Sequence, residues 1–342
     1  MTAIDQSGQP TPQLFFQTAN AYQRTQALKA AIELDLFTAM GEGKNTAAVL
    51  AQRCGAAERG VRILADNLTI QGFITKDGDH YTLTPDSKMF LDRRSPAYMG
   101  SMLAFLHAPM FTEAFQKMTE AVRKGGTVAG EAGTVAPEHP LWVEFAMSMM
   151  PMMVRPADEI AGFVSQIQPG VKKVLDIAAG HGLFGIEIAK RCPQAEIIAL
   201  DWPNVLAVAQ ENARKAGVQQ RYRTIAGDAF KSDIGNGYDL VLLTNFLHHF
   251  SAAVCESLLH KIHHSLTAGG RVITLEFVPN DDRITPPQVA EFSLIMLATT
   301  PEGDAYTFKE YDQMFRTTGF SPNELRAVPG SLQQMIVSHK AG

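Results

Sequence analysis

The sequence predicts an α/β protein with a doubly wound, Rossmann-like sheet behind a separate helical domain. Strand-like and helix-like segments alternate from about residue 171 onward, the pattern of a mostly parallel sheet with helices on both faces. The chain before that point is almost entirely helix-like, and 342 residues exceed the usual size of one domain. We therefore expect a helical domain over residues 13–100. Residues 101–342 would hold linker helices and then the sheet, whose core begins at about residue 166.

The N-terminal domain is expected to combine helices with one hairpin. Apolar residues recur at helical spacing from about Leu14 to Met40, and shorter helices follow near Thr46–Cys54 and Glu58–Gln71. Residues 73–85 then read as two short strands around Asp77-Gly78, which favours a tight hairpin. Helices followed by a hairpin predict a winged-helix-like shape.

A winged helix can bind DNA, so a DNA-binding regulator is one alternative function. In the third helix, however, Arg59 and Arg62 are balanced by Glu58 and Asp66, and a nucleic-acid reader should show a basic face. We favour a dimerisation domain over a DNA-binding one.

Residues 95–164 are expected to be helical and are rich in Met and Phe, with a loop from Gly125 to Pro140 marked by its Gly and Pro content. Such a stretch is usually core or helix interface. Because thioethers are soft and adaptable, a few of these side chains could also line a flat apolar ligand.

The predicted sheet contains parallel strands, intervening helices and a final hairpin. The hairpin turns at Pro329-Gly330, and its last strand would lie antiparallel in the sheet. The expected strands are 174–177, 197–200, 223–226, 238–244, 270–277, 323–328 and 333–338, and the expected helices are 182–191, 205–217, 253–266 and 311–317.

Composition argues against several classes of protein. The formal charge of −5 gives no attraction to nucleic acid or to an anionic membrane. No apolar run is long enough to span a bilayer, and the polar N-terminus lacks a signal pattern. Cys54, Cys192 and Cys255 lie apart, without metal or redox spacing. We expect a cytoplasmic protein with reduced cysteines and no metal site.

The most informative motif is a glycine turn between two strand-end carboxylates. Asp176 and Asp201 end the first two strands, and Gly180-His181-Gly182 follows the first of them. Glycines allow both a sharp turn and a close approach of ligand to the main chain. With Gly185 the turn also fits a dinucleotide motif. Asp176, however, would repel a pyrophosphate and suits a cationic sulfonium and amino group. We therefore predict a site for S-adenosylmethionine.

Further strand ends complete this expected cofactor site. Ligands of such sheets bind beyond the carboxyl ends of the strands. Asp201 can accept both ribose hydroxyls, while Asp228 and Ala229 can meet the adenine, although Asp228 could instead be a turn carboxylate. Asn245 and Glu276 end two later strands at the same edge.

A histidine at the mouth of the sheet is the candidate general base. His248 and His249 follow the strand that ends near Asn245, and a histidine there can remove the proton of an attacking hydroxyl. The alternative is a histidine packed at a strand–helix junction. We favour catalysis for His248 and less so for His249. The histidines of the next helix, His260, His263 and His264, are expected on a solvated face rather than around a metal.

These motifs resemble those of the S-adenosylmethionine-dependent O-methyltransferases of plant caffeic-acid and flavonoid metabolism and of bacterial polyketide, phenazine and hydroxyneurosporene metabolism. The resemblance covers nearly the whole chain. Leu200-Asp201-Trp202-Pro203 is similar to the family's Asp-Leu-Pro cofactor segment, and Gly227-Asp228-Ala229-Phe230 to its Gly-Asp-Met-Phe segment. Leu247-His248-His249-Phe250-Ser251 resembles its His-Asp-Trp-Ser segment.

The resemblance implies roles for individual residues. It makes His248 the base, Glu276 the residue that orients it, Trp202 part of the cofactor segment, and the N-terminal domain a homodimer contact. Phe145-Ala146-Met147 loosely resembles an element that contacts substrate.

Two positions depart from the family pattern. Ala305 stands where plant members have a second glutamate beside the base, and His249 replaces the aspartate after it. Relatives with altered surroundings of the base can methylate carbon or nitrogen, so a C- or N-methyltransferase is the alternative to O-methylation.

We thus expect a methyltransferase acting on a hydroxyl of a small aromatic or polyene metabolite. Its acceptor pocket would be walled by aromatic and Met side chains, namely Phe105, Trp142, Met147, Met150, Phe246, Phe292 and Met296.

Overall fold

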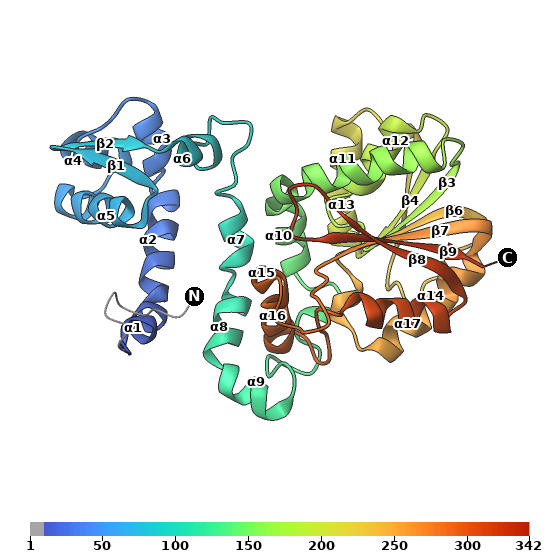
Figure 1. Cartoon of the computed structure of the whole chain (residues 1–342). Coiled ribbons are helices and arrows are strands. Elements are labelled where there is room, and N and C mark those ends of the chain that lie inside the picture. The colour runs from blue at the N-terminus through green and yellow to red at the C-terminus, as the bar shows by residue number, and fades with distance from the viewer. Residues whose placement is uncertain (1–9, 342) are drawn as a thin grey trace. The chain divides into compact units, whose positions relative to one another are not determined.

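A computed structural model describes residues 10–341 as two compact units, one ending at Leu103 and the other beginning at Ala104 (Figure 1). No helix in this described range is long and apolar enough to cross a membrane.

The first unit packs short helices around a small hairpin. Asn20 and the left-handed Asp35, with φ of +57°, divide the expected first helical region into three helices. Buried Leu36, Phe37 and Leu68 form the centre of its core. The elements are α1 (Gln13–Ala19), α2 (Ala21–Glu33), α3 (Leu36–Gly41), α4 (Ala47–Cys54), α5 (Glu58–Gln71), β1 (Ile74–Asp77), β2 (His80–Leu83) and α6 (Pro85–Phe90).

The second unit begins with helices that precede its sheet. α7 (Met102–Leu106) crosses the boundary between the units. The loop predicted after Gly125 contains one short 3₁₀ helix, η1 (Gly133–Val135). The remaining helices of this region are α8 (Pro109–Gln116), α9 (Met118–Lys124), α10 (Leu141–Ser148) and α11 (Met150–Ile167).

The sheet of the second unit has seven strands in the order β5-β4-β3-β6-β7-β9-β8. The strands β3 to β7 pair in parallel, whereas β9 is antiparallel to both of its neighbours. The predicted α/β class and antiparallel last strand are therefore confirmed. The strands are β3 (Lys173–Ile177), β4 (Glu196–Asp201), β5 (Tyr222–Ala226), β6 (Tyr238–Thr244), β7 (Leu266–Glu276), β8 (Phe320–Ala327) and β9 (Gln334–Lys340).

Helices cover both faces of this sheet (Figure 1). Alternating side chains of β3 serve two cores: Val174 packs with α11 and α12, and Leu175 packs with α14 and α17 on the opposite face. These helices are α12 (Leu183–Arg191), α13 (Pro203–Lys215), α14 (Ala252–Ser265) and α17 (Phe308–Thr317).

The strand order reverses at β3, because the chain leaves it for β4 and β5 on one side and returns to β6 on the other. A ligand crevice is expected at the carboxyl ends of strands at such a switch point. The glycine turn follows β3 directly, so the fold places it there.

Candidate active site

The turn after β3 is held in place by the carboxylate at the end of β4. Gly180 N–H donates to Asp201 Oδ2 at 2.8 Å, and Trp202 N–H donates to Asp201 Oδ1 at 2.7 Å. Burial raises the pKa of the Asp201 carboxyl to about 6, although these two backbone bonds act in the opposite direction. Two predicted cofactor residues, Gly180 and Asp201, are thus in direct contact.

The glycines of the turn meet a steric need. Gly180 and Gly182 have φ of +56° and +76°, in the left-handed region that favours glycine. A Cβ on Gly182 would lie 2.6 Å from the Tyr222 hydroxyl oxygen, which is too close. A Cβ on Gly180 would lie 3.7 Å from the Phe145 ring, so Phe145 covers the turn.

Asp176 lies beneath the turn. Its side chain shares the α12 face of β3 with Val174, and its Oδ2 accepts from Gly185 N–H at 3.2 Å. Its Oδ1 is buried and has no hydrogen-bond partner within residues 10–341, and burial raises the pKa of this carboxyl to about 7. A buried polar atom without a partner calls for a ligand or water. Contact of Asp176 with the cofactor's cationic end remains a prediction.

His181, between the two glycines, is a residue of this site that the motif alone did not single out. Its ring stacks on Phe145 at 6.1 Å between centroids and also faces Phe184. Its Nδ1 accepts from Leu183 N–H at 3.1 Å, while its buried Nε2 finds no hydrogen-bond partner in the part of the chain that the structure describes. Burial lowers the pKa of His181 to about 4, so the ring is neutral at physiological pH.

The predicted adenine side lies after β5. Asp228 Oδ1 accepts from Phe230 N–H at 2.9 Å, as a turn carboxylate would, and Asp228 Oδ2 lies 3.5 Å from Lys231 Nζ. Ala229 is buried beside it. Phe246 packs here with Phe230 and Phe250. Phe250 in turn meets the His249 ring edge-to-face at 6.3 Å between centroids, so Phe246 is joined to the rings around His248 through Phe250.

The candidate base is anchored by a buried glutamate. His248 Nδ1 contacts Glu276 Oε2, and Glu276 Oε1 accepts from Phe246 N–H at 3.1 Å and Leu247 N–H at 2.9 Å. His248 and Glu276 are 3% and 0% exposed, so water does not compete for this contact. His249 lies on the other side of the base, with its Nε2 3.1 Å from His248 Nε2.

An alanine occupies the position at which plant members of the family have a second glutamate. Ala305 is fully buried and carries no acid. Gly303 nearby lies against the base loop, because a Cβ there would be 2.4 Å from the His248 carbonyl oxygen. The glutamate at 276 and the imidazole at 249 are the groups that contact the His248 ring nitrogens.

Aromatic rings extend from the base to the turn. His248 meets Phe292 edge-to-face at 4.8 Å between centroids, and His249 meets Trp142 in the same way at 5.0 Å. Phe145 contacts both Trp142 and Phe105, at 6.1 and 5.2 Å. Phe105, Trp142 and Phe292 from the predicted wall are therefore brought together.

The predicted Met residues are placed differently from one another. Met296 is buried on α16 (Phe292–Thr299), a helix that the sequence analysis did not anticipate. Met150 Sδ accepts from Asn212 Nδ2 at 3.5 Å, and the same amide donates to the His181 carbonyl at 2.9 Å. Met147 is 65% exposed and takes no part in these ring contacts.

Asn245 connects the site to the end of the chain. It has φ of +56°, and its Oδ1 accepts from Nε2 of Gln333, which lies between β8 and β9. Its Nδ2 contacts Met153 Sδ at 3.7 Å. Gln333 is 2% exposed and was not foreseen, because nothing near it in the sequence indicates a partner 88 residues away.

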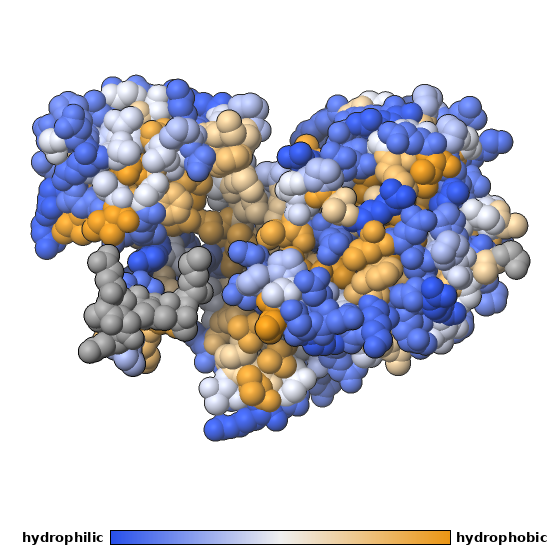
Figure 2. All heavy atoms as spheres, in the orientation of Figure 1, coloured by the Kyte–Doolittle hydropathy of each residue, from blue (hydrophilic) through white to orange (hydrophobic). Residues whose placement is uncertain are grey.

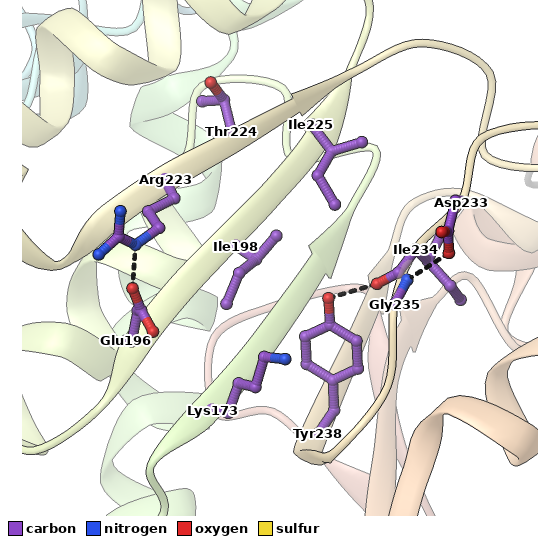
Figure 3. Close-up of a pocket in the computed structure, with 10 residues that line it drawn as sticks. All are labelled: Lys173, Glu196, Ile198, Arg223, Thr224, Ile225, Asp233, Ile234, Gly235 and Tyr238. Atoms are coloured by element: carbon purple, nitrogen blue, oxygen red, sulfur yellow. Dashed lines mark hydrogen bonds and ion pairs between the residues drawn. The ribbon is translucent and has the colours of Figure 1, made fainter.

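A separate hollow of about 590 Å³ lies where the parallel strands begin (Figure 3). Its charged groups are largely satisfied: Arg223 pairs with Glu196, and Lys173 Nζ donates to the Asn236 carbonyl and lies 4.6 Å from the Tyr238 ring. Because it opens at the opposite strand ends from Asp201 and His248, it is not part of the candidate active site.

Comparison with known proteins places these features in a family. Residues 163–321 match the model of the O-methyltransferase domain, and residues 16–93 match that of the O-methyltransferase dimerisation domain. The chain is 31% identical to 3-hydroxy-5-methyl-1-naphthoate 3-O-methyltransferase of Streptomyces sahachiroi, over 96% of this chain and 95% of that protein.

Solved structures of similar proteins agree with this family assignment. A protein from Nostoc punctiforme PCC 73102, described as an O-methyltransferase, is 56% identical with a TM-score of 0.95, over 97% of this chain and 100% of that one. Human N-acetylserotonin methyltransferase in complex with S-adenosylmethionine has the same fold, with 23% identity and a TM-score of 0.84 over the full length of both chains.

Proposed function

Since the chain belongs to the S-adenosylmethionine-dependent O-methyltransferases that carry a dimerisation domain, we propose that it methylates a hydroxyl group of a small aromatic or polyene metabolite, with His248 as the general base. The observation that carries this proposal is the buried His248–Glu276 pair at the strand edge that also holds the Gly180 turn.

Glu276 determines which nitrogen of His248 is basic. Because its carboxylate oxygens accept hydrogen bonds, His248 Nδ1 carries the proton of the neutral ring and Nε2 presents the lone pair. When a proton arrives, the imidazolium forms next to a carboxylate, which stabilises it. This arrangement suits removal of the proton from an acceptor hydroxyl as its oxygen attacks the methyl group.

The residues around the turn fit S-adenosylmethionine. Asp201 would accept the ribose hydroxyls, Gly180 and Gly182 leave the main chain open to the methionine portion, and Asp228 and Ala229 would meet the adenine. Trp202 and Asn245 would flank the cofactor. The unpartnered buried Asp176 Oδ1 and His181 Nε2 are further groups that a ligand or its waters could satisfy. When bound, the cofactor supplies a methyl group on a cationic sulfur.

The acceptor would lie among the rings next to the base. Phe105, Trp142 and Phe292 form part of one connected ring set with His248 and His249. Flat rings at these edge-to-face distances favour a planar aromatic or polyene partner, because stacking adds to the burial of apolar area. A naphthol is a suitable first probe, since 3-hydroxy-5-methyl-1-naphthoate is named as the acceptor of the 31% identical relative.

We also propose that the protein is a homodimer through its first unit. Apolar side chains interrupt the hydrophilic surface (Figure 2), and those of the first unit include Phe15, Phe16 and Ile70, which are 68%, 56% and 82% exposed. Phe16 and Ile70 lie within residues 16–93, which match the dimerisation domain, and Phe15 directly precedes them, so we expect these exposed apolar groups to meet a second copy. Light scattering should give twice the chain mass, and a monomer at micromolar concentration would contradict the assignment.

Labelled methyl transfer tests the function. The purified chain is incubated with S-adenosylmethionine carrying a deuterated methyl group and a panel of naphthols and other phenols, and products are analysed by mass spectrometry. We expect the label on an oxygen atom. His248→Ala should slow transfer by at least about 100-fold, the usual share of a general base, with cofactor affinity unchanged. His260→Ala, an exposed histidine of α14, is the matched control.

The outcomes separate the proposals. Label on carbon or nitrogen would replace hydroxyl methylation by the alternative chemistry that the Ala305 departure suggests. Full activity of His248→Ala would show that His248 is not the base.

A further inference from the structure

The reactive nitrogen of His248 is already occupied by a second histidine. His248 Nε2 lies 3.1 Å from His249 Nε2, and the ring centroids are 4.2 Å apart. With Glu276 as the acceptor, His248 Nδ1 holds the proton and Nε2 of the neutral ring accepts. The hydrogen bond between the rings is therefore donated by His249 Nε2–H.

This assignment leaves His249 Nδ1 as a bare acceptor. The atom is buried and has no hydrogen-bond partner among the described residues, and His249 as a whole is 8% exposed. A buried acceptor without a donor destabilises the folded protein. Such an atom in a ligand site can accept a hydrogen bond from a donor on the ligand, such as a hydroxyl.

His249 also lies between the base and the turn. The ring contacts run from Gly180 to Phe145, from Phe145 to Trp142, and from Trp142 to His249. On its other side His248 contacts Phe292. In this series of contacts His249 stands between the rings that reach the turn and the His248 ring.

The electrostatics of the pair suit transfer rather than storage of a proton. Burial, and secondarily the neighbouring His248, lowers the pKa of His249 well below its usual value. His249 therefore stays neutral and must release one proton when it takes another. His248 has the carboxylate that can stabilise a positive charge.

We propose that His249 Nδ1 receives the proton of the acceptor hydroxyl while His249 Nε2–H passes its proton to His248 Nε2. The base of this enzyme is then a two-histidine relay. The O–H bond of the acceptor breaks and an O–CH₃ bond forms, while the sulfonium S–CH₃ bond breaks with its electron pair left on sulfur. His248 ends as the imidazolium beside Glu276, and His249 ends with its proton on Nδ1. This inference rests on the proposed function.

The first test needs no acceptor. Ring-nitrogen NMR of the full chain with ¹⁵N-labelled histidine, at a pH where both rings are neutral, reports which nitrogen carries each proton. We expect His249 protonated on Nε2 and His248 on Nδ1, with the His248 Nε2 resonance shifted in His249→Phe. A neutral His249 with its proton on Nδ1 would overturn the relay, because that atom could not accept.

The second test uses methyl transfer to the naphthol probe. His249→Phe keeps a ring of similar size but removes both nitrogens, so we expect cofactor affinity within threefold of wild type and transfer at least about 100-fold slower. A double variant with His248→Phe should be no slower than the worse single variant, because residues of one relay act as a unit. His260→Phe controls for adding an aromatic ring.

Failure of the relay is distinguishable from failure of the proposed function. If His249→Phe transfers methyl within threefold of wild type while His248→Phe is inactive, His248 is the sole base and only the relay is wrong. If His248→Phe keeps its activity, the base assignment itself fails. If the probe is not methylated by wild type, the NMR result still decides the tautomers on which the relay depends.

Discussion

Replacement of Asp201 by Asn is the sharpest probe of the proposed cofactor site. The carboxylate accepts two backbone N–H groups, from Gly180 and Trp202. An amide has one acceptor oxygen, so its NH₂ would face one of these donors and leave it unsatisfied. Such a loss costs about 1–3 kcal/mol of unfolding free energy, because both contacts are present in the free protein. Binding is weakened by the lost contact to the ribose hydroxyls, and a hydrogen bond to a charged group, worth about 1.5–3 kcal/mol, corresponds to about 10- to 150-fold in Kd.

The effect should depend on pH. Burial raises the pKa of Asp201 to about 6 in the free protein, and ribose hydroxyls that donate to the ionised form would lower that pKa in the complex. Binding therefore releases a proton below pH 6. Wild-type affinity should fall as pH drops from 7 to 5, approaching tenfold per unit below pH 6. Asn does not titrate, so the difference in cofactor affinity between wild type and Asp201→Asn should shrink at low pH.

Calorimetric titration with S-adenosylhomocysteine, the product left after methyl transfer, measures the affinity loss and its pH dependence between pH 5 and 8 without turnover. Circular dichroism confirms that the variant is folded, and Asp77→Asn, at an exposed position on β1, is the matched control. The reasoning would be refuted by an Asp201→Asn variant that binds within threefold of wild type at pH 8. It would equally be refuted by identical pH slopes for the two proteins.

Three further predictions concern glycines and a buried acid. Gly182→Ala should cost about 1–3 kcal/mol more unfolding free energy than Gly217→Ala. Both glycines have φ above +70°, but among the described residues a Cβ would meet another side chain at Gly182 and not at Gly217. Equal losses of unfolding free energy in urea would contradict the clash at Gly182. Asp176 is protonated up to about pH 7 in the folded protein, so its stabilising effect is complete below the unfolded pKa near 3.8 and is lost as pH rises through 7. Wild type should therefore lose up to roughly 4 kcal/mol relative to Asp176→Asn between pH 4 and 8, and a difference independent of pH would mean that the acid is ionised in the folded protein. Gly303→Ala should displace the His248 carbonyl and slow methyl transfer by about tenfold or more without changing cofactor affinity, and wild-type turnover would show that the base loop tolerates the shift.

Much of the second unit could be predicted from the sequence because its strands are short, apolar and buried on both faces. The run at 238–244 is an example: it is short and mostly apolar and follows Gly235 and Gly237, which predicts a central strand, and the structure has β6 over those residues. The end of such a strand then places Asn245 and His248 at the ligand edge without further information. The functional prediction could therefore be based on the residues that follow the parallel strands.

The parts that could not be predicted depend on the orientation of side chains in irregular segments. Phe246 and His248 are two residues apart in the sequence. Because the 3₁₀ turn Leu247–His249 begins directly after Phe246, the Phe246 ring contacts Phe230 while the His248 ring contacts Phe292. Likewise α16, the helix that carries Phe292, is apolar on nearly all sides, so it shows no helical periodicity.

The His249 contact illustrates a third limit. The sequence shows a histidine where the family has an aspartate, but only the fold brings its Nε2 to the Nε2 of His248. Adjacent residues in an extended strand would point to opposite faces. In the 3₁₀ turn Leu247–His249 their rings instead lie side by side.

The position of β9 inside the sheet has a consequence for how the molecule is made. Gln334–Lys340 lies between β7 and β8, although it is the last strand in sequence. During synthesis β8 therefore emerges before the strand that must separate it from β7. The sheet therefore cannot be completed until residue 340 has left the ribosome, whereas the Gln333 contact with Asn245 needs the chain only through residue 333. A chain released before residue 333 would carry Asp201 and His248 but would lack both β9 and this contact.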